Sequence, residues 1–196
     1  MARPFLIRHA IARLGLRAVR WHTVGTVPSR GILVGAPHTS NWDWVLTMLL
    51  AWDSRVQIRL LVKESFFKGP LGSFLRWTGA VELDRAHPGA TIRDLLEDAA
   101  NDETFLLGIA AEGTRGKVDH WKSGFYRISR QTGIPVTLAF LDARTRTVGW
   151  GPTFDLTGDV GADMERIRAF YADKTGIRPE LTTTPRLREE QTGVVG

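Results

Sequence analysis

The sequence predicts an α/β protein built as a single layered domain, in which helices flank a mostly parallel central sheet. Three observations support this prediction. Short apolar runs that are typical of buried strands alternate along the chain with amphipathic segments of helical period. The 196 residues, 43% of them apolar, are enough for one domain with a substantial core. No internal repeat and no linker-like segment divides the chain.

The strand predictions rest on short apolar runs bounded by Gly, Pro or polar residues. The strongest signal is the run from Thr104 to Ala111, because it is almost continuously apolar. The run from Gly31 to Pro37 also suits a buried strand. Further strands are expected over residues 56–62, 80–83 and 135–141, and residues 144–150 are expected to pair with the last of these.

Helices are predicted between these strands. One begins at Asn41 and continues through Leu50, and another covers residues 122–132 and stops at Gly133, a residue type that commonly ends helices. The segment Gly69-Pro-Leu-Gly72 predicts a turn. Further helices are expected over residues 89–101 and 161–175, and the Thr-, Arg- and Glu-rich residues 182–196 are expected to form a mobile tail.

The N-terminal residues 1–25 are predicted to hold a basic amphipathic helix over residues 4–21. Residues 1–42 contain six arginines and no Asp or Glu. Two interpretations of the helix stay open: it covers the core with solvated arginines, or it lies on an anionic membrane surface. Its apolar face repeats at i, i+4, i+7, i+11 and i+14, and consists of Ile7, Ile11, Leu14, Ala18 and Trp21.

The charge and composition of the chain favour some classes of function and exclude others. The formal net charge of +5 favours an anionic partner, such as nucleic acid, a membrane surface or a phosphorylated substrate. The absence of cysteine excludes thiolate catalysis, disulfides and Cys-ligated zinc. No run reaches the ~18 apolar residues that span a bilayer, and arginines interrupt the N-terminal segment too often for a signal peptide. We therefore expect a cytoplasmic protein, soluble or attached to a membrane face.

A histidine and an aspartate follow the first predicted strand, in the order His38-Thr-Ser-Asn-Trp-Asp43. A loop at this point presents the imidazole to a cleft, and Asp43 at the opening of the next helix accepts from the far ring nitrogen. Such a pair is a general base without a nucleophile of its own, which suits a reaction whose nucleophile arrives on a substrate. The spacing alone also fits Asp43 as a simple helix N-cap. One His and one Asp are too few ligands for zinc.

Two more polar segments follow predicted strands. Arg85 ends the segment from Gly79, and its guanidinium suits phosphate or carboxylate, with a surface ion pair as the structural alternative. The segment Glu112-Gly113-Thr114-Arg115 follows the strongest strand. Its glycine frees backbone N–H groups for an anion, Arg115 adds a fixed charge, and Glu112 is expected to bond a hydroxyl or to hold Arg115. An ordinary polar turn is the alternative.

The order of these segments resembles the glycerolipid acyltransferase family, whose best-known members are the lysophosphatidic acid (1-acylglycerol-3-phosphate) acyltransferases. The likeness covers residues 31 to about 141. It rests on the HxxxxD motif at residues 38–43, the Asp-Arg at residues 84–85, Glu-Gly-Thr-Arg at residues 112–115 and Ile-Pro-Val at residues 134–136. The chain departs from the family pattern in lacking an aromatic residue before Asp84-Arg85 and in having Gly116 in place of Ser.

The resemblance implies a fold like that of glycerol-3-phosphate acyltransferases, with residues 26–181 as the acyltransferase domain, and it implies a role for each motif residue. His38 would remove the proton from the acceptor hydroxyl, and Asp43 would orient it. Arg85 and Arg115 would bind the acceptor phosphate. The acceptor pocket would be shaped by Glu112 and Gly113, with Thr114 also binding substrate and Lys63 adding charge.

The resemblance further implies acyl-CoA or acyl carrier protein as the co-substrate, a lysophospholipid or glycerol-phosphate acceptor, and no other cofactor or metal. It suggests a bacterial branch that is peripheral on the inner face of the cell membrane, with no nucleic-acid partner. Two other classes remain open on the residues alone. A thioesterase or other hydrolase would use the same pair on water, and a non-enzymatic module would bind anionic lipid or nucleic acid through its basic charge.

Overall fold

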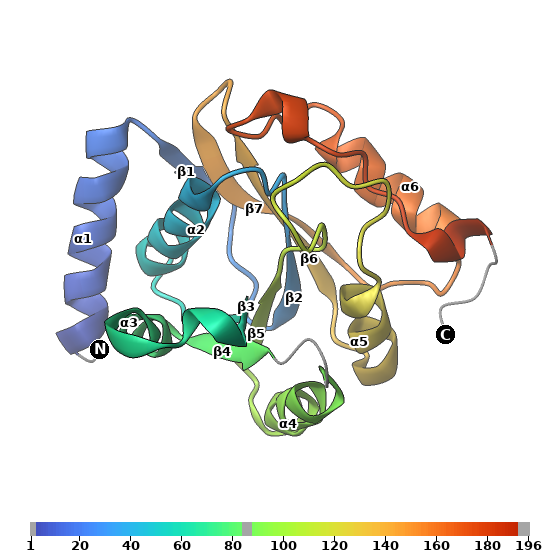
Figure 1. Cartoon of the computed structure of the whole chain (residues 1–196), viewed down its shortest axis with the longest axis horizontal. Helices are drawn as coiled ribbons and strands as arrows, with labels where there is room; N and C mark the ends of the chain where they lie inside the picture. The colour runs from blue at the N-terminus through green and yellow to red at the C-terminus, as the bar shows by residue number, and fades with distance from the viewer. Residues whose placement is uncertain (1–2, 84–87, 192–196) are drawn as a thin grey trace.

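A seven-stranded sheet forms the centre of the protein, in the spatial order β1-β7-β6-β2-β5-β3-β4 (Figure 1). The structure, a computed structural model, describes residues 3–83 and 88–191. The layered α/β fold predicted from the sequence is confirmed. The strands are β1 (His22–Val24), β2 (Gly31–Ala36), β3 (Arg59–Lys63), β4 (Ala80–Leu83), β5 (Leu106–Ile109), β6 (Val136–Asp142) and β7 (Thr147–Phe154).

The strands β2 to β6 run parallel to one another, so their carboxyl ends lie at one edge of the sheet. Strands β6 and β7 pair antiparallel, which confirms the expected pairing of these two segments. The short strand β1, which the sequence does not predict, pairs parallel with β7. The polar loops after β2, β3 and β5 therefore gather along the same edge, as is usual in parallel sheets.

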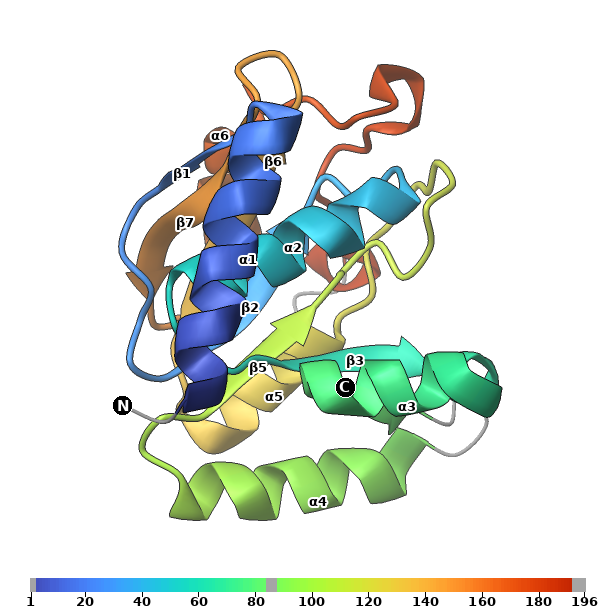
Figure 2. The same ribbon diagram turned by 90° about the vertical axis from the view of Figure 1, so that its left-hand side faces the viewer.

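Helices cover both faces of the sheet. The helices are α1 (Arg3–Val19), α2 (Asn41–Asp53), α3 (Gly69–Thr78), α4 (Pro88–Asn101), α5 (Gly124–Thr132) and α6 (Val160–Tyr171), with 3-10 turns η1 (Glu64–Phe66), η2 (Pro179–Leu181) and η3 (Arg188–Gln191). Figure 2 shows α1, α2 and α3 on the side that faces the viewer. Helix α1 packs on α2 and forms the outermost layer of that side.

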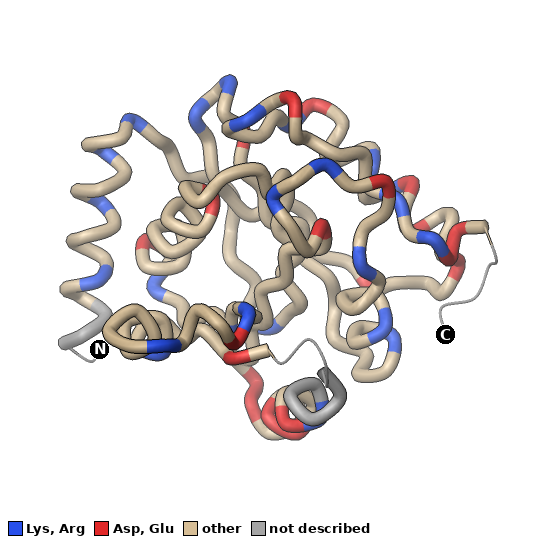
Figure 3. Tube along the Cα trace, in the orientation of Figure 1, with Lys and Arg blue, Asp and Glu red and all other residues tan. Residues whose placement is uncertain are grey.

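The apolar face predicted for α1 points outward rather than toward the core. Ile7 and Leu14 are 63% and 72% exposed, whereas Ala12 and Leu16, from the opposite side of the helix, are buried against α2. Arg13 and Arg17 of α1 are exposed, and the helix carries no Asp or Glu along its length (Figure 3). In the part of the chain that the structure describes, no helix is both long and apolar enough to cross a bilayer.

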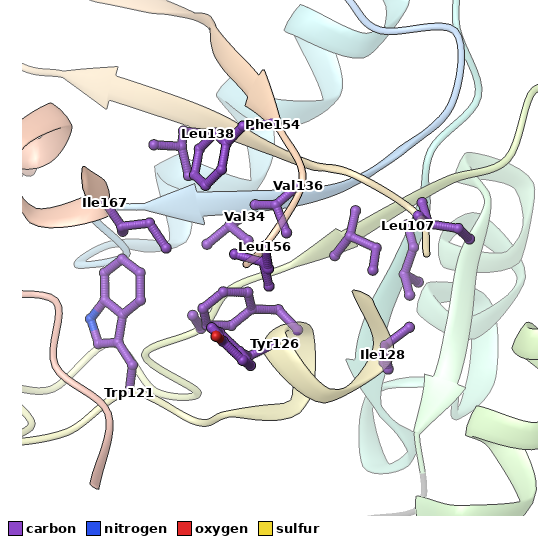
Figure 4. Packing of buried hydrophobic residues seen from close by; sticks show 14 of the residues in the cluster. Val34, Leu107, Trp121, Tyr126, Ile128, Val136, Leu138, Phe154, Leu156 and Ile167 are labelled. Carbon is purple, nitrogen blue, oxygen red and sulfur yellow. The ribbon is translucent and has the colours of Figure 1, made fainter. Parts of the chain in front are cut away.

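Two apolar clusters hold the layers together. The larger joins one face of the sheet to α4, α5 and α6, and Figure 4 shows Val34, Val136 and Leu138 of the sheet meeting Tyr126 and Ile167. The smaller joins the other face to α1 and α2. Because successive side chains of a strand point to opposite faces, β2 contributes Ile32 and Val34 to the first cluster and Leu33 to the second.

The segment from Gly69 to Gly72, expected to be a turn, is the first turn of α3. Pro70 occupies an early helical position, where the missing N–H has no helical partner to lose. A Cβ at Gly72 would lie 2.0 Å from the carbonyl oxygen of Phe67. The glycine therefore permits close packing of α3 on η1, and it is not a helix breaker here.

The C-terminal residues 182–191, expected from their composition to belong to a mobile tail, pack against α6 and the loop after β5. Leu187 is buried, and its N–H donates to Glu190 Oε1. Glu190 Oε2 in turn pairs with Arg168 Nη1 of α6 at 2.6 Å. The Trp121 N–H donates to the carbonyl of Arg186 at 2.7 Å. These contacts place the segment beside the carboxyl edge of the sheet.

Candidate active site

The loop after β2 is shaped by the start of α2. Ser40 is the N-cap of α2, and its Oγ accepts from the Trp42 N–H. Asp43, three residues later, completes a capping box by accepting the Ser40 N–H at 2.7 Å. The loop is thereby closed on itself, with His38 immediately before it and the Ala36–Pro37 peptide bond in the cis form.

The structure brings His38 and Asp43 together as expected. His38 Nδ1 lies 3.5 Å from Asp43 Oδ2, and the two side chains are 21% and 6% exposed. The same Oδ2 accepts the backbone N–H groups of Thr39 and Ser40. Asp43 is therefore the carboxylate beside the imidazole, and it supports the helix cap as the third residue of α2. The N-cap itself is Ser40 rather than Asp43.

Glu112 connects the loop after β5 to the loop after β2. Its side chain is buried, with 1% of the residue exposed, and Oε1 accepts the His38 backbone N–H at 3.0 Å. The sequence prediction placed this carboxylate on a substrate hydroxyl or on Arg115. The structure instead directs it inward to His38, because β2 and β5 are neighbours in the sheet.

The electrostatics of this cluster follow from burial. Burial, with the positive charge of Arg115 as a second cause, lowers the pKa of His38 to about 4. Burial raises the pKa of Asp43, against the effect of the two backbone N–H donors and Arg115. Burial also raises the pKa of Glu112 to about 7, opposed by the His38 N–H and reinforced by the charge of Asp43. At neutral pH the imidazole is therefore unprotonated, as a general base requires.

The other expected site residues lie along the same edge. Gly113 has a φ of +70°, a backbone conformation that favours glycine, and Thr114 and Arg115 after it are exposed. Arg115 is close enough to influence the pKa of both His38 and Asp43. Lys63 is exposed at the end of β3, which neighbours β5. Arg85 lies outside the described residues.

The strand order explains why distant motifs meet. The described loops follow β2, β5 and β3, which are consecutive in the sheet although they are not consecutive in the chain. Adjacent strands are roughly 4.8 Å apart, so Lys63 at the end of β3 lies about 10 Å from β2. Among residues 3–83 and 88–191, no group of three or more His, Asp or Glu side chains is arranged to hold a metal ion.

Sequence reasoning missed two residues of this region. Thr39 is fully buried, and its Oγ1 accepts the Arg178 N–H from the far end of the chain, a contact that no local pattern reveals. Lys122 lies across Gly113, because a Cβ at that glycine would be 3.2 Å from Lys122 Cγ. By contrast, the Ser40-x-x-Asp43 pattern is a readable capping signal.

Comparisons with known proteins identify the family and the fold of the chain. A sequence model of the Acyltransferase family matches residues 18–138, which include the loops after β2, β3, β4 and β5. A crystal structure of the 1-acyl-sn-glycerophosphate (LPA) acyltransferase PlsC from Thermotoga maritima shares the fold, with a TM-score of 0.60 and 19% sequence identity. The alignment covers 87% of this chain and 76% of that one. A comparison with curated protein sequences gave no match. Since the family model spans more than half of its residues, the chain belongs to the Acyltransferase family.

Proposed function

We propose that the protein transfers a fatty acyl group from a thioester, acyl-CoA or acyl carrier protein, to the hydroxyl of a lysophospholipid or glycerol-phosphate acceptor. The observation that carries this proposal is the contact between His38 and Asp43 at the carboxyl edge of the sheet. The hydroxyls next to His38 are buried and already accept hydrogen bonds: Thr39 from Arg178, and Ser40 from Trp42. The nucleophile is therefore expected to arrive on the acceptor.

In the proposed reaction, Nε2 of His38 removes the proton of the acceptor hydroxyl while the oxygen attacks the thioester carbonyl carbon. Asp43 beside Nδ1 stabilises the imidazolium that forms. The tetrahedral intermediate then expels the thiolate, which takes the proton from the imidazolium, and an ester and a free thiol leave. A positioned general base of this kind contributes about 10²–10⁴-fold to the rate.

The cations along the sheet edge supply a binding site for the acceptor phosphate in this proposal. Arg115 follows β5 directly and lies near the imidazole, while Lys63 ends the neighbouring strand β3. Arg85 is assigned the same role from the family resemblance. A guanidinium offers two parallel N–H donors to a phosphate, which fixes orientation as well as charge.

An apolar hollow beside the start of α2 offers a place for the acyl chain. It measures about 280 Å³ and lies between α2 and the ends of α1 and β6. Trp42 and Leu46 of α2 line it together with Trp21 and Ile177. Trp42 immediately precedes Asp43 in the chain, so the first turn of α2 contributes to both the hollow and the proposed catalytic pair.

We further infer that the protein works on a membrane face, with α1 and α3 against the lipid. Four exposed apolar residues of α1 (Leu6, Ile7, Ile11 and Leu14) and three of α3 (Leu71, Phe74 and Trp77) form what we term the α1–α3 surface. The two helices are joined by Arg8, whose Nη2 donates to the Trp77 carbonyl and whose guanidinium lies 4.5 Å from the Trp77 ring centroid. Exposed arginines of α1 flank the surface, as suits an anionic interface.

The decisive test is a thioester-consumption assay with acyl-CoA and acyl carrier protein, each with a panel of lysophospholipid and glycerol-phosphate acceptors. The wild type should consume thioester only when an acceptor is present. His38→Ala should lose about 10²–10⁴-fold in kcat, whereas His22→Ala, at an exposed position on β1, should retain the wild-type rate. Release of free fatty acid without an acceptor would support a thioesterase instead. No turnover by the wild type with any pair would overturn the proposal.

A further inference from the structure

A polar hollow of about 470 Å³ lies beside the proposed active site, between the loop after β5 and the C-terminal segment. It shares Glu112 with the site, since that carboxylate also accepts the His38 N–H. Its volume is within the range of about 300–1,000 Å³ typical of small-molecule sites. The hollow is lined by Glu112, Gly113, Thr114, Lys122 and Arg188, together with Val118, Asp119 and His120.

Lys122 is held in place at this hollow by its backbone and by its side-chain stem. Its N–H donates to the carbonyl of Ala111 at 2.7 Å, which fixes the lysine to the end of β5. Its stem runs over Gly113, where a Cβ would lie 3.2 Å from Cγ and 3.7 Å from Cε. The aliphatic part is thus packed against the Glu-Gly-Thr-Arg loop, and the ammonium group remains exposed at the hollow.

Arg188 of the C-terminal segment lines the same hollow. It is the first residue of the turn η3, whose preceding residue, Leu187, is buried. The turn is further fixed by Glu190, which accepts from the Leu187 N–H and pairs with Arg168 of α6. An exposed guanidinium is therefore presented from an ordered turn.

Trp121 ties the two cation-bearing segments together. Its backbone N–H donates to the Arg186 carbonyl at 2.7 Å, and its indole Nε1 donates to Thr183 Oγ1 at 3.3 Å. Trp121 itself is buried. Because Trp121 immediately precedes Lys122, and residue 186 lies two positions before Arg188, these contacts hold together the two segments whose cations line the hollow.

We propose that Lys122 and Arg188 form a phosphate subsite for one of the two reactants, separate from Arg115, which does not line the hollow. This inference rests on the proposed acyl transfer, in which both the donor and the acceptor carry phosphate. The carboxylates that face the cations are Asp119 and Glu112. Burial keeps Glu112 partly protonated near neutral pH, since its pKa is about 7, so the lining favours an anion. Lysine and arginine at close range bind phosphate through charge-assisted hydrogen bonds.

Binding of inorganic pyrophosphate, measured by isothermal titration calorimetry on the full chain, tests the subsite without any turnover. Lys122→Ala and Arg188→Ala should each weaken binding about tenfold or more, since each removes a hydrogen bond between charged groups. Lys117→Ala and Arg186→Ala are matched controls, because they remove the same charges from the same segments but do not line the hollow. Equal weakening by the control variants, or no weakening by any variant, would overturn the subsite.

Steady-state kinetics identify which reactant the subsite holds. A rise in KM for the donor alone assigns the phosphate to the thioester carrier, and a rise for the acceptor alone assigns it to the acceptor headgroup. Lys122→Arg should recover most of the loss, because the charge is retained. An unchanged KM for both reactants, alongside normal wild-type turnover, refutes the subsite and leaves the proposed function intact. Absence of wild-type turnover refutes the proposed acyl transfer. In that case the pyrophosphate titration still tests whether the subsite binds phosphate.

Discussion

At the scale of single residues, one carboxylate holds two different partners. Asp43 Oδ2 lies beside His38 Nδ1 and accepts the backbone N–H groups of Thr39 and Ser40. The backbone contacts fix the carboxylate, so the distance to the imidazole is set by the helix cap as much as by the pair itself. Asp43 is therefore expected to contribute both to the stability of the fold and to the proposed catalysis, and variants are needed that separate the two contributions.

Comparison of Asp43→Ala with Ser40→Ala separates the two roles. Both variants remove part of the capping box and should lower the free energy of unfolding by about 0.5–2 kcal/mol. Only Asp43→Ala removes the carboxylate beside His38, so it alone should reduce kcat by orders of magnitude. The checks are chemical denaturation and the thioester assay. An equal loss of kcat in Ser40→Ala would mean that the carboxylate acts only through the shape of the loop.

The lowered pKa of His38 predicts activity that persists into acid. Because the pKa of the imidazole is about 4, the unprotonated base form predominates above that pH and is lost as pH falls through it. The acidic limb of log kcat/KM should thus lie well below the ordinary histidine value of 6.5. Arg115→Gln removes the smaller of the two causes, so it should move the pKa upward while burial keeps it below 6.5. An NMR titration of the His38 ring follows both proteins, and an unchanged pKa in the variant would rule out an electrostatic effect of Arg115.

The raised pKa of Glu112 predicts a stabilising substitution at neutral pH. With a folded pKa of about 7 against an ordinary 4.5, the contribution of Glu112 to stability is fully present below pH 4.5 and is lost as pH rises through 7. Glu112→Gln keeps an oxygen acceptor for the His38 N–H but does not ionise. Relative to wild type, the variant should therefore gain up to about 3 kcal/mol in free energy of unfolding between pH 4.5 and pH 8. Urea denaturation at both pH values measures the difference, and a constant difference would show that Glu112 titrates normally.

At the scale of helices and strands, the sequence predicts the strands from β2 to β7 but not β1, and it does not predict correctly what surrounds several segments. Continuous apolar runs in the sequence predict β2 and β5, because strands that are buried on both faces of a sheet are apolar at nearly every position. The start of α3 is missed because Pro70 and Gly72 have the composition of a turn, while their positions suit a helix packed closely on Phe67. Periodicity finds the apolar face of α1 but cannot tell whether protein, solvent or lipid covers it.

In the candidate site, too, contacts between residues close in the sequence could be predicted, whereas contacts that depend on the order of strands could not. The pairing of His38 with Asp43 could be predicted, because five residues and one helix start determine it. The inward direction of Glu112 could not, since it depends on β5 lying next to β2. Likewise, Lys122 and Arg188 line the same hollow because the C-terminal segment folds back onto the loop after β5.

The hollow between α1, α2 and β6 predicts control over acyl length. Ile177→Trp adds volume to the lining of this hollow, to which Trp42 also contributes. The variant should lower kcat/KM for long-chain thioesters by about tenfold while short-chain substrates keep most of theirs, since each CH₂ that loses its apolar contact costs about 0.8 kcal/mol. The ratio of rates across a series of chain lengths is its own internal control. A uniform decrease at every length would place the acyl chain elsewhere.

At the scale of the whole molecule, apolar and basic side chains share the outer side formed by α1 and α3. Deletion of α1 would also uncover Ala12 and Leu16 contacts on α2, so point variants are the cleaner test. Leu14→Ser, at a position that is 72% exposed, should weaken binding to anionic vesicles about tenfold without changing the stability of the protein. Val24→Ser, an exposed substitution on β1, should have no effect.

Binding to these vesicles should also weaken as salt is raised, because the arginines of α1 contribute roughly 1 kcal/mol each near an anionic surface. Vesicle co-sedimentation at low and high ionic strength measures both effects. If vesicle binding changes neither with ionic strength nor in Leu14→Ser, the α1–α3 surface is excluded as the membrane face.

The position of β5 has a consequence for the protein as it is synthesised. β5 is the fourth of the five parallel strands to leave the ribosome among β2 to β6, yet it lies between β2 and β3. A nascent chain that ends before residue 105 carries His38 and Asp43 but has nothing to join their strand to β3. The buried carboxylate that supports the histidine loop is delivered with that late strand, so an incomplete chain cannot hold a working site.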